Sequence, residues 1–351
     1  DWSSDVCSSD LTTRIGRWAA LLGAGAILAL TVAPVMAQDA EGDNPYFETG
    51  AVEGSGAGMK IGYISLGDQL PFVKLVSDSI AAQAAIAGAE LVACDSQVDA
   101  AKSLECGQNL GVQGVQGVIN FNLFGDSSPE ICNAYGNVPT IAIDINQPPC
   151  QVTFFGANNY HAGEIGGIGA GEGLMAENGC TYDKIVTLES ASAGVVNTDR
   201  VQGMLDGFAS ICGALDESKV IHQEVGGTTD LALEIVNNLL PTLAPGSITV
   251  FLSLNDDMGL GALAAARTAG READIRIGAQ GADPSAWQEI ACNPNWLADA
   301  AYFPEAYGRT VIPAMIDLLS GKELPEALYT PHQAINKDNI REVYPETPAC
   351  A

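Results

Sequence analysis

The chain has 351 residues, with 43 Asp and Glu against 15 Lys and Arg, and therefore a formal net charge of −28 at pH 7. This negative charge argues against nucleic acids and anionic membrane surfaces as partners, and it is typical of a solvated exterior, including that of a protein from a salty habitat. Hydrophobic residues make up 47% of the chain, which is enough for the cores of two lobes.

The first 37 residues are expected to lie outside the folded protein. The chain begins with Asp rather than Met, which indicates a fragment, and residues 1–11 look like a translated sequencing adapter, with a native Ser-rich leader as the alternative. Two Arg residues then precede an apolar run from Trp18 to Leu30, and small residues lead to Ala37. This pattern predicts a signal peptide over 12–37, cleaved after Ala37, with an uncleaved anchor as the alternative. We therefore expect a periplasmic or secreted protein.

Nine cysteines occur, and eight of them follow the adapter-like residues. An even number suits disulfides in an oxidising compartment, although the sequence permits many pairings. We predict sequential pairing, because three pairs then join neighbouring elements of one β/α unit and the fourth holds the C-terminal tail. The predicted pairs are Cys94–Cys106, Cys132–Cys150, Cys180–Cys212 and Cys292–Cys350. A metal site is the alternative, but no Cys-x-x-Cys occurs and the three His residues are far apart in sequence. We expect no metal and no cofactor.

Residues 38–58 are acidic and Gly-rich and predict a flexible tether. After it, β-branched apolar runs alternate with helical patterns in a first series. Its strands are expected at Lys60–Ser65, Glu90–Ala93, Gly117–Asn122, Pro139–Ile145 and Val152–Phe155. Its helices are expected at Pro71–Ala87, Ala100–Leu110, Ser128–Tyr135 and in a Gly-rich stretch that ends at Asn178.

A second series has the same rhythm. Its strands are expected at Lys184–Leu188, Val220–Val225, Ser247–Ser253, Ile275–Ala279 and Ala300–Phe303, with an extended stretch at Tyr329–Ala334. Its helices are expected at Thr198–Ala214, Asp230–Leu240, Asp257–Ala269, Pro284–Ala291 and Glu305–Leu319. Strands that are separated by helices predict parallel sheets with right-handed crossovers, and two such series predict two lobes.

The most informative motif is Ser247–Gly261. An apolar strand is followed by Asn255-Asp256-Asp257 and then by a helical pattern, so polar side chains lie at the carboxyl end of a buried parallel strand, where open α/β sheets bind ligands. A strand followed by Asn-Asp-x-Met and Gly-x-Gly-Ala-Leu resembles the sugar-binding type I periplasmic binding proteins, the ribose- and galactose-binding-like soluble receptors of ABC importers. The resemblance covers about residues 59–345.

The resemblance implies an α/β fold of two Rossmann-like lobes with parallel sheets, joined by a hinge of three crossovers. The N-terminal lobe would comprise residues 59–157 plus 303–332, and the C-terminal lobe residues 158–302 plus 333–345. It further implies a monomeric receptor, not an enzyme, that captures a small sugar or polyol in the interlobe cleft and delivers it to an ABC permease. A sugar-processing enzyme and a sensory receptor on the same fold are the alternatives.

A sugar presents hydroxyls and weakly apolar ring faces, so its site needs planar polar partners and aromatic plates. By resemblance, Phe72 matches an aromatic residue that stacks on the sugar, although Leu70 stands where the family commonly has Asn. Asp144 matches a carboxylate that accepts sugar hydroxyls, although Ile145 replaces the Arg that often follows. Core packing for Phe72 and a helix cap for Asp144 are the structural alternatives.

Phe121 and Asn122 end the strand before Asp144, and Phe121 is a candidate second plate, with core packing as the alternative. Arg200 matches a family Arg that reaches into the cleft from the start of a helix. An Arg opposes the helix dipole there, which favours a functional reason for its position.

Five further candidates come from the second lobe and its hinge. Asn255 matches a cleft Asn, while the two aspartates after it are expected to cap the next helix, with Asp256 also a candidate ligand. Gln280 replaces a family Asp, Asp283 lies three residues beyond, and Tyr302 stands where a hinge-proximal polar residue is usual. These departures predict an altered ligand, such as a polyol or another small polar solute.

Overall fold

The computed structural model describes residues 44–350. The adapter-like residues 1–11, the expected signal peptide 12–37 with its cleavage site, and the start of the expected tether lie outside the described residues. Within residues 44–350, no helix is long and apolar enough to cross a membrane.

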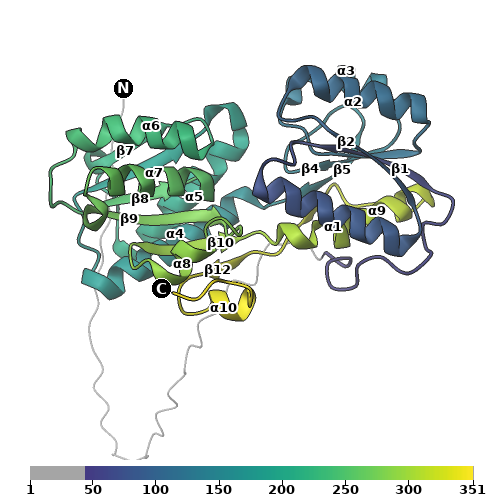
Figure 1. Cartoon of the computed structure of the whole chain (residues 1–351). Helices are drawn as coiled ribbons and strands as arrows, with labels where there is room; N and C mark the ends of the chain where they lie inside the picture. The colour runs from purple at the N-terminus through teal and green to yellow at the C-terminus, as the bar shows by residue number, and fades with distance from the viewer. Residues whose placement is uncertain (1–43, 351) are drawn as a thin grey trace, which may run out of the picture. The chain divides into compact units, whose positions relative to one another are not determined.

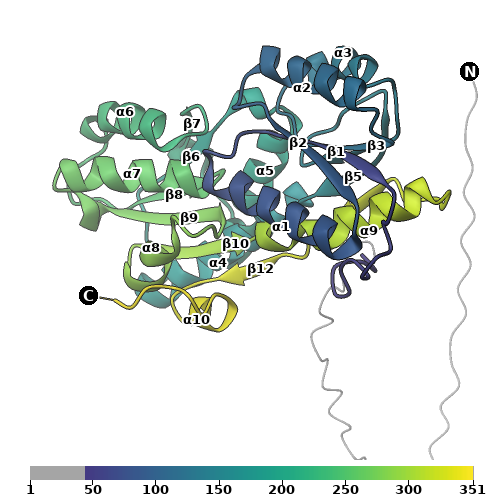
Figure 2. The ribbon, with the colours of Figure 1, turned by 45° about the vertical axis from the view of Figure 1, so that its right-hand side comes forward.

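The first lobe is built on a parallel sheet of six strands in the order β11-β5-β4-β3-β1-β2. These strands are β1 (Lys60–Ser65), β2 (Glu90–Asp95), β3 (Gly117–Asn120), β4 (Thr140–Ile143), β5 (Gln151–Gly156) and β11 (Ala327–Tyr329). Helices α1 (Pro71–Ala87) and α9 (Tyr307–Leu319) lie side by side on one face, and α2 (Ala100–Gln113) and α3 (Ser128–Ala134) cover the other (Figures 1 and 2). Both faces are therefore buried, which explains the continuous apolar runs of the strands.

The second lobe repeats this plan in the order β12-β10-β9-β8-β6-β7, with β12 antiparallel to β10 and the other pairs parallel. Its strands are β6 (Lys184–Glu189), β7 (Val220–Glu224), β8 (Thr249–Ser253), β9 (Ile275–Gly281), β10 (Trp296–Ala301) and β12 (Gln333–Ile335). Helices α4 (Asn159–Asn178) and α5 (Val195–Cys212) cover one face, and α6 (Thr229–Leu239), α7 (Asp256–Thr268) and α8 (Trp287–Cys292) the other, with α10 (Ile340–Val343) beside α8. The predicted α/β class, with two mostly parallel sheets, is confirmed.

The chain passes from one sheet to the other three times: after β5, after β10 and after β11. The three connecting segments are hydrogen-bonded to one another. The Thr330 N–H donates to the Gly156 carbonyl (2.9 Å), and the Thr330 hydroxyl donates to the Tyr302 carbonyl (2.8 Å). The single extended stretch predicted at 329–334 is therefore two short strands in different sheets, with Thr330 between them.

Two predictions about elements are wrong. Strand β10 begins at Trp296 rather than Ala300. Asp299 interrupts the apolar pattern of the sequence, so the first residues of the strand were not predicted. In the structure Asp299 is wholly buried and hydrogen-bonded, and the strand continues through it. The flexible tether is also wrong for residues 44–58. The Tyr46 hydroxyl donates to Asp317 of α9, the Arg309 guanidinium donates to the Phe47 carbonyl, and backbone bonds join this segment to the end of α1.

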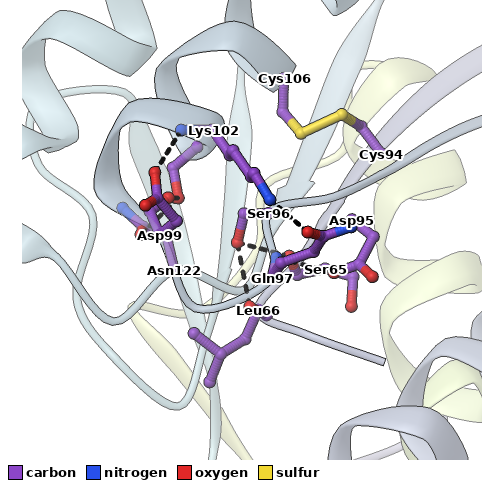
Figure 3. The surroundings of a disulfide bond; sticks show 11 residues. Ser65, Leu66, Cys94, Asp95, Ser96, Gln97, Asp99, Lys102, Cys106 and Asn122 are labelled. Atoms are coloured by element: carbon purple, nitrogen blue, oxygen red, sulfur yellow. Dashed lines mark hydrogen bonds between the residues drawn. A yellow bond between two sulfur atoms is a disulfide. The ribbon is translucent and has the colours of Figure 1, made fainter. Parts of the chain in front are cut away.

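The sulfurs of all four predicted cysteine pairs are bonded. Their Cα–Cα distances are 5.5 Å for Cys94–Cys106, 5.9 Å for Cys132–Cys150, and 5.4 Å for both Cys180–Cys212 and Cys292–Cys350. These separations are those that a disulfide requires. Figure 3 shows the first pair, which joins β2 to α2 above the loop that carries Ser96 and Gln97.

Candidate functional site

A cavity of about 270 Å³ lies at the carboxyl ends of strands from both sheets and is lined by residues of both lobes. In each sheet the first strand of the series lies between the second and the third, so β1/β3 and β6/β8 are the points where the strand order reverses. Ligands of open α/β sheets bind outside such points. A larger cavity of about 810 Å³ adjoins it and shares six lining residues with it: Leu123, Asp144, Ile145, Ser192, Ala193 and Val196.

The cavity brings together nine of the ten ligand-binding candidates from the sequence. They are Phe72, Phe121, Asp144, Arg200, Asn255, Asp256, Gln280, Asp283 and Tyr302. Asn122 is the exception. It is fully buried, its amide donates to the Phe124 carbonyl, and its Oδ1 accepts from the Ser103 hydroxyl (3.2 Å). Asn122 therefore holds a loop beneath the cavity.

Asp144 follows β4 in the left-handed region of the backbone, with φ of 57°. Its Oδ1 accepts a hydrogen bond from the Tyr307 hydroxyl (3.2 Å), which comes from the start of α9. Burial raises the pKa of Asp144 to about 6, and the positive charge of Arg200 and the Tyr307 hydrogen bond partly oppose this rise. The Asp144 carboxyl thus lies where the two cavities meet, and whether it accepts or donates a hydrogen bond there depends on whether it is protonated near pH 6.

Arg200 reaches the cavity from α5 of the second lobe. Its Nε donates to Asn159 Oδ1 (2.8 Å), its Nη1 donates to the Leu254 carbonyl (3.3 Å), and its guanidinium carbon lies 4.8 Å from the centre of the Tyr302 ring. No carboxylate within residues 44–350 forms a salt bridge with it. These contacts fix the guanidinium while leaving donors for an acceptor in the cavity.

The position of Arg200 depends on close packing between α4 and α5. A Cβ at Gly163 of α4 would collide with the backbone carbonyl of Arg200, and a Cβ at Gly203 of α5 would collide with the carbonyl of Tyr160. The Gly-rich composition of α4 therefore has a packing reason, since it allows the two backbones to touch.

Aromatic rings line the hinge side of the cavity. Phe72 meets Tyr302 and Tyr307 edge to face, with ring centres 6.3 and 5.8 Å apart. The Tyr302 hydroxyl donates to Gln280 Oε1 (2.7 Å), which leaves Gln280 Nε2 buried without a partner. Phe121 is buried in the core of the first lobe, which confirms the core-packing alternative, and it also lines the cavity, so its role as an aromatic plate stays a prediction.

The second lobe contributes a group of buried carboxyls. Asp256 Oδ2 accepts from the Asp283 N–H (2.9 Å), and its pKa is raised well above the usual value by burial and by the nearby Asp299 and Asp283. Burial raises the pKa of Asp299 to about 7, and the charge of the neighbouring Asp299 carboxyl in turn helps to raise the pKa of Asp256. We infer that the two share a proton, because like charges this close do not both ionise. Burial also raises the pKa of Asp283.

Asn255, not an aspartate, caps α7. Its Oδ1 accepts from the Met258 N–H (2.9 Å), and its amide donates to the Gly227 carbonyl (3.0 Å). The expected capping by Asp256 and Asp257 is therefore wrong, since both lie inside the first turn. Asn255 lines the cavity with a side chain that is already hydrogen-bonded.

Sequence reasoning missed three residues that position the candidates: Tyr307, Asn159 and Asp299. Asn159 lies just beyond a strand end, where polar residues signal a site, but nothing local marked Tyr307 or the strand residue Asp299. Within residues 44–350, no group of three His, Cys, Asp or Glu side chains is arranged to hold a metal ion.

Comparisons with known proteins identify the family and the fold of this chain. Residues 61–323 match the family model described as periplasmic binding protein domain. The ribose import binding protein RbsB of Escherichia coli is 27% identical over 261 residues, covering 72% of this chain and 82% of RbsB.

Two solved structures share the fold. An ABC transporter solute binding protein from Mycobacterium smegmatis with bound glycerol aligns with a TM-score of 0.72 and 23% identity, over 84% of this chain and 100% of that one. A periplasmic solute binding protein from Actinobacillus succinogenes with bound D-allose aligns with a TM-score of 0.70 and 15% identity, over 81% of this chain and 99% of that one. The match of the family model over most of the folded lobes shows that the chain belongs to the periplasmic binding proteins.

Proposed function

We propose that this protein is an exported receptor that binds one small sugar or polyol between its lobes and delivers it to an ABC permease. The observation that carries the proposal is the cavity with walls from both lobes, in which Asp144 and Arg200 come from opposite sides. Hydroxyls are donors to the carboxylate and acceptors for the guanidinium, and the C–H groups of a sugar ring suit the face of an aromatic ring such as that of Phe72.

Ligand contacts on both walls explain how binding would be signalled. A ligand that touches both lobes stabilises the closed arrangement over an open one, because it makes both sets of contacts only when the lobes are together. The lobe limits 59–157 plus 303–332 and 158–302 plus 333–345, with the three connecting segments as the hinge, are part of this proposal. So is the monomeric state, in which one chain supplies both walls.

The names of similar proteins support a sugar or a polyol as the ligand. The relative RbsB is named for ribose import, and the two structural neighbours hold glycerol and D-allose. Export is supported by the signal-like sequence of residues 12–37 and by four disulfides, which form in oxidising compartments.

Isothermal titration calorimetry with a panel of neutral sugars and polyols tests the proposal. We expect at least one ligand with a dissociation constant on the order of micromolar, equivalent to about −8 kcal/mol. Asp144→Ala and Arg200→Ala should each weaken its binding by about 1–3 kcal/mol, because each leaves a buried partner unpaired. Glu172→Ala, on the exposed side of α4, is the matched control and should bind as the wild type does.

Unchanged affinity in both Asp144→Ala and Arg200→Ala would contradict the assignment of this cavity as the ligand site. Recovery of the ligand chemically unaltered after long incubation with the protein is expected, and its conversion would favour the rival enzyme.

A further inference from the structure

The two walls of the 270 Å³ cavity differ in chemistry. Among the described residues that line it, the first lobe contributes one polar side chain, Asp144. Its other lining residues are Leu66, Leu70, Phe72, Val73, Val98, Phe121, Leu123 and Ile145. The wall of the second lobe includes Arg200, Asp256, Gln280 and Asp283, so it supplies hydrogen-bonding groups of both kinds.

Two polar side chains of the first lobe near this wall, Asp68 and Asn122, are engaged inside the lobe. Asp68 Oδ1 accepts from the hydroxyls of Ser65 (2.5 Å) and Ser77 (2.7 Å). Asn122 bonds Ser103 and Phe124, as described above. A ligand hydroxyl that points toward this wall, away from Asp144, therefore meets carbon, and a hydroxyl buried without a partner is unfavourable.

Val98 gives independent support, because its side chain lines the cavity although its backbone has a conformation that is unfavourable for Val. Its φ is 57°, in the left-handed region where a β-branched residue is an outlier. Two sets of hydrogen bonds hold the loop. The Val98 N–H donates to the Leu66 carbonyl (2.6 Å), and the Ser96 hydroxyl donates to the carbonyls of Ser65 and Leu66 (Figure 3). Such strain concentrates at ligand-binding positions.

The charged groups that line the cavity favour a neutral ligand over an anionic one. Four carboxyl groups line the cavity, those of Asp144, Asp256, Asp257 and Asp283, against the single guanidinium of Arg200. An anionic ligand would approach mainly carboxyl oxygens, which repel it whenever they are ionised. A neutral ligand with hydroxyls on one side avoids this cost and pairs with the same groups.

From this asymmetry we propose that the ligand is a neutral deoxy sugar or deoxy polyol, whose methyl or methylene face lies on the first lobe and whose hydroxyls face the second. The inference rests on the proposed function, of which it narrows the ligand class. The ligand carbon that carries no hydroxyl faces the part of the wall formed by Leu70, Val98 and Ile145.

Calorimetry on matched pairs that differ by one hydroxyl tests this assignment. The pairs are D-fucose against D-galactose, L-rhamnose against L-mannose, and deoxyribose against ribose, with D-galacturonate as the anionic probe. In at least one pair the deoxy member should bind roughly 10- to 100-fold more tightly, the discrimination typical of an apolar pocket that meets an added hydroxyl. D-galacturonate should not bind.

Val98→Asn is the variant of choice, because Asn tolerates a positive φ better than Val and the fold should be kept. It places an amide in the apolar wall, so it should reduce the preference for the deoxy member by about tenfold. Val112→Asn, at a side chain of α2 that is 88% exposed, makes the same change away from the cavity and should leave the preference as it is. Ile145→Asn provides a second polar insertion into the same wall.

The outcomes separate this inference from the function on which it rests. Equal or tighter binding of the hydroxylated member in every pair that binds, or an unchanged preference in both polar variants, overturns the inference alone. Failure of every sugar and polyol in both panels to bind overturns the proposed function together with it.

Discussion

The polar side chains at the carboxyl ends of the strands point in different directions in the two lobes. In the first lobe, the polar residues at and after the end of β3 turn inward, where Asn120 and Asn122 lie close to the buried Gln147 (3.3 and 3.4 Å between side-chain atoms). In the second lobe, Asp256 after β8 and Gln280 within β9 line the cavity. The same position in the topology thus gives a structural amide on one side and a candidate ligand contact on the other.

The difference teaches that a strand end places a polar side chain near a site but does not decide which way it faces. Gln147 decides this for the first lobe. Its amide donates to the Asn122 carbonyl (2.6 Å) and its Oε1 lies within reach of both asparagine amides, so it fills the space beneath the wall. The second lobe has its own internal partner, Asp299, but this residue lies behind Asp256 and leaves it at the cavity.

The largest effect is expected where the polar wall depends on backbone contact. In Gly163→Ala the new methyl group meets the Arg200 carbonyl, so α4 and α5 must separate. The cost of overpacking, about 3 kcal/mol of unfolding free energy, outweighs the helix-propensity gain of about 1 kcal/mol. Displacement of Arg200 should also weaken ligand binding about tenfold, or about 1.4 kcal/mol. Urea unfolding and calorimetry measure both quantities, and full retention of both would show that Arg200 does not depend on this contact.

A smaller effect is expected from the carboxyl pair behind the polar wall. Asp299→Asn keeps the shape but leaves either the Ala282 N–H or the Trp296 indole N–H without an acceptor, which should cost about 1–3 kcal/mol at pH 5. In the wild type, the folded state holds protons on this pair between about pH 4 and 7 that the unfolded chain has released, because the pKa of Asp299 is raised to about 7. The contribution of the pair to stability therefore falls as pH rises through this range.

Asp299→Asn removes this proton binding, so the stability difference from the wild type should shrink between pH 5 and pH 8. The raised pKa of Asp144 acts with the same sign but is common to both proteins and cancels. Asp338→Asn, at a side chain with 76% exposure, is the matched control and should follow the wild-type pH profile. Parallel profiles for wild type and Asp299→Asn across urea titrations would refute the shared proton.

The smallest effect tests the inward-facing side of the comparison. Asn122→Ala leaves the Phe124 N–H without its side-chain acceptor and should lower the unfolding free energy by about 1–2 kcal/mol. Ligand affinity should stay within about twofold of wild type, since Asn122 lies outside the cavity lining. A large loss of affinity with little loss of stability would place Asn122 in the site after all.

Periodicity and turn signals were sufficient to predict the order of strands and helices, because each buried run is long and is bounded by polar or glycine residues. Strand ends such as Asp144 and Asp256, where polar residues follow apolar runs, indicated where a site would lie, and the choice of individual candidates came from the family resemblance. The direction of Asn122 was not predictable, because its partner Gln147 lies 25 residues away in a loop without periodicity. The attachment of residues 44–58 to α9 was missed for the same reason: its contacts span more than 260 residues.

Each sulfur–sulfur bridge in the described part of the chain begins and ends in the same half of the molecule. Within residues 44–350, the covalent cross-links thus lie inside each lobe, and the covalent connections between the lobes are three backbone segments. Oxidation of the cysteines should therefore raise the thermal stability of each lobe without a covalent bond between them. The proposed closure of the lobes on a ligand would then be independent of the redox state of the medium.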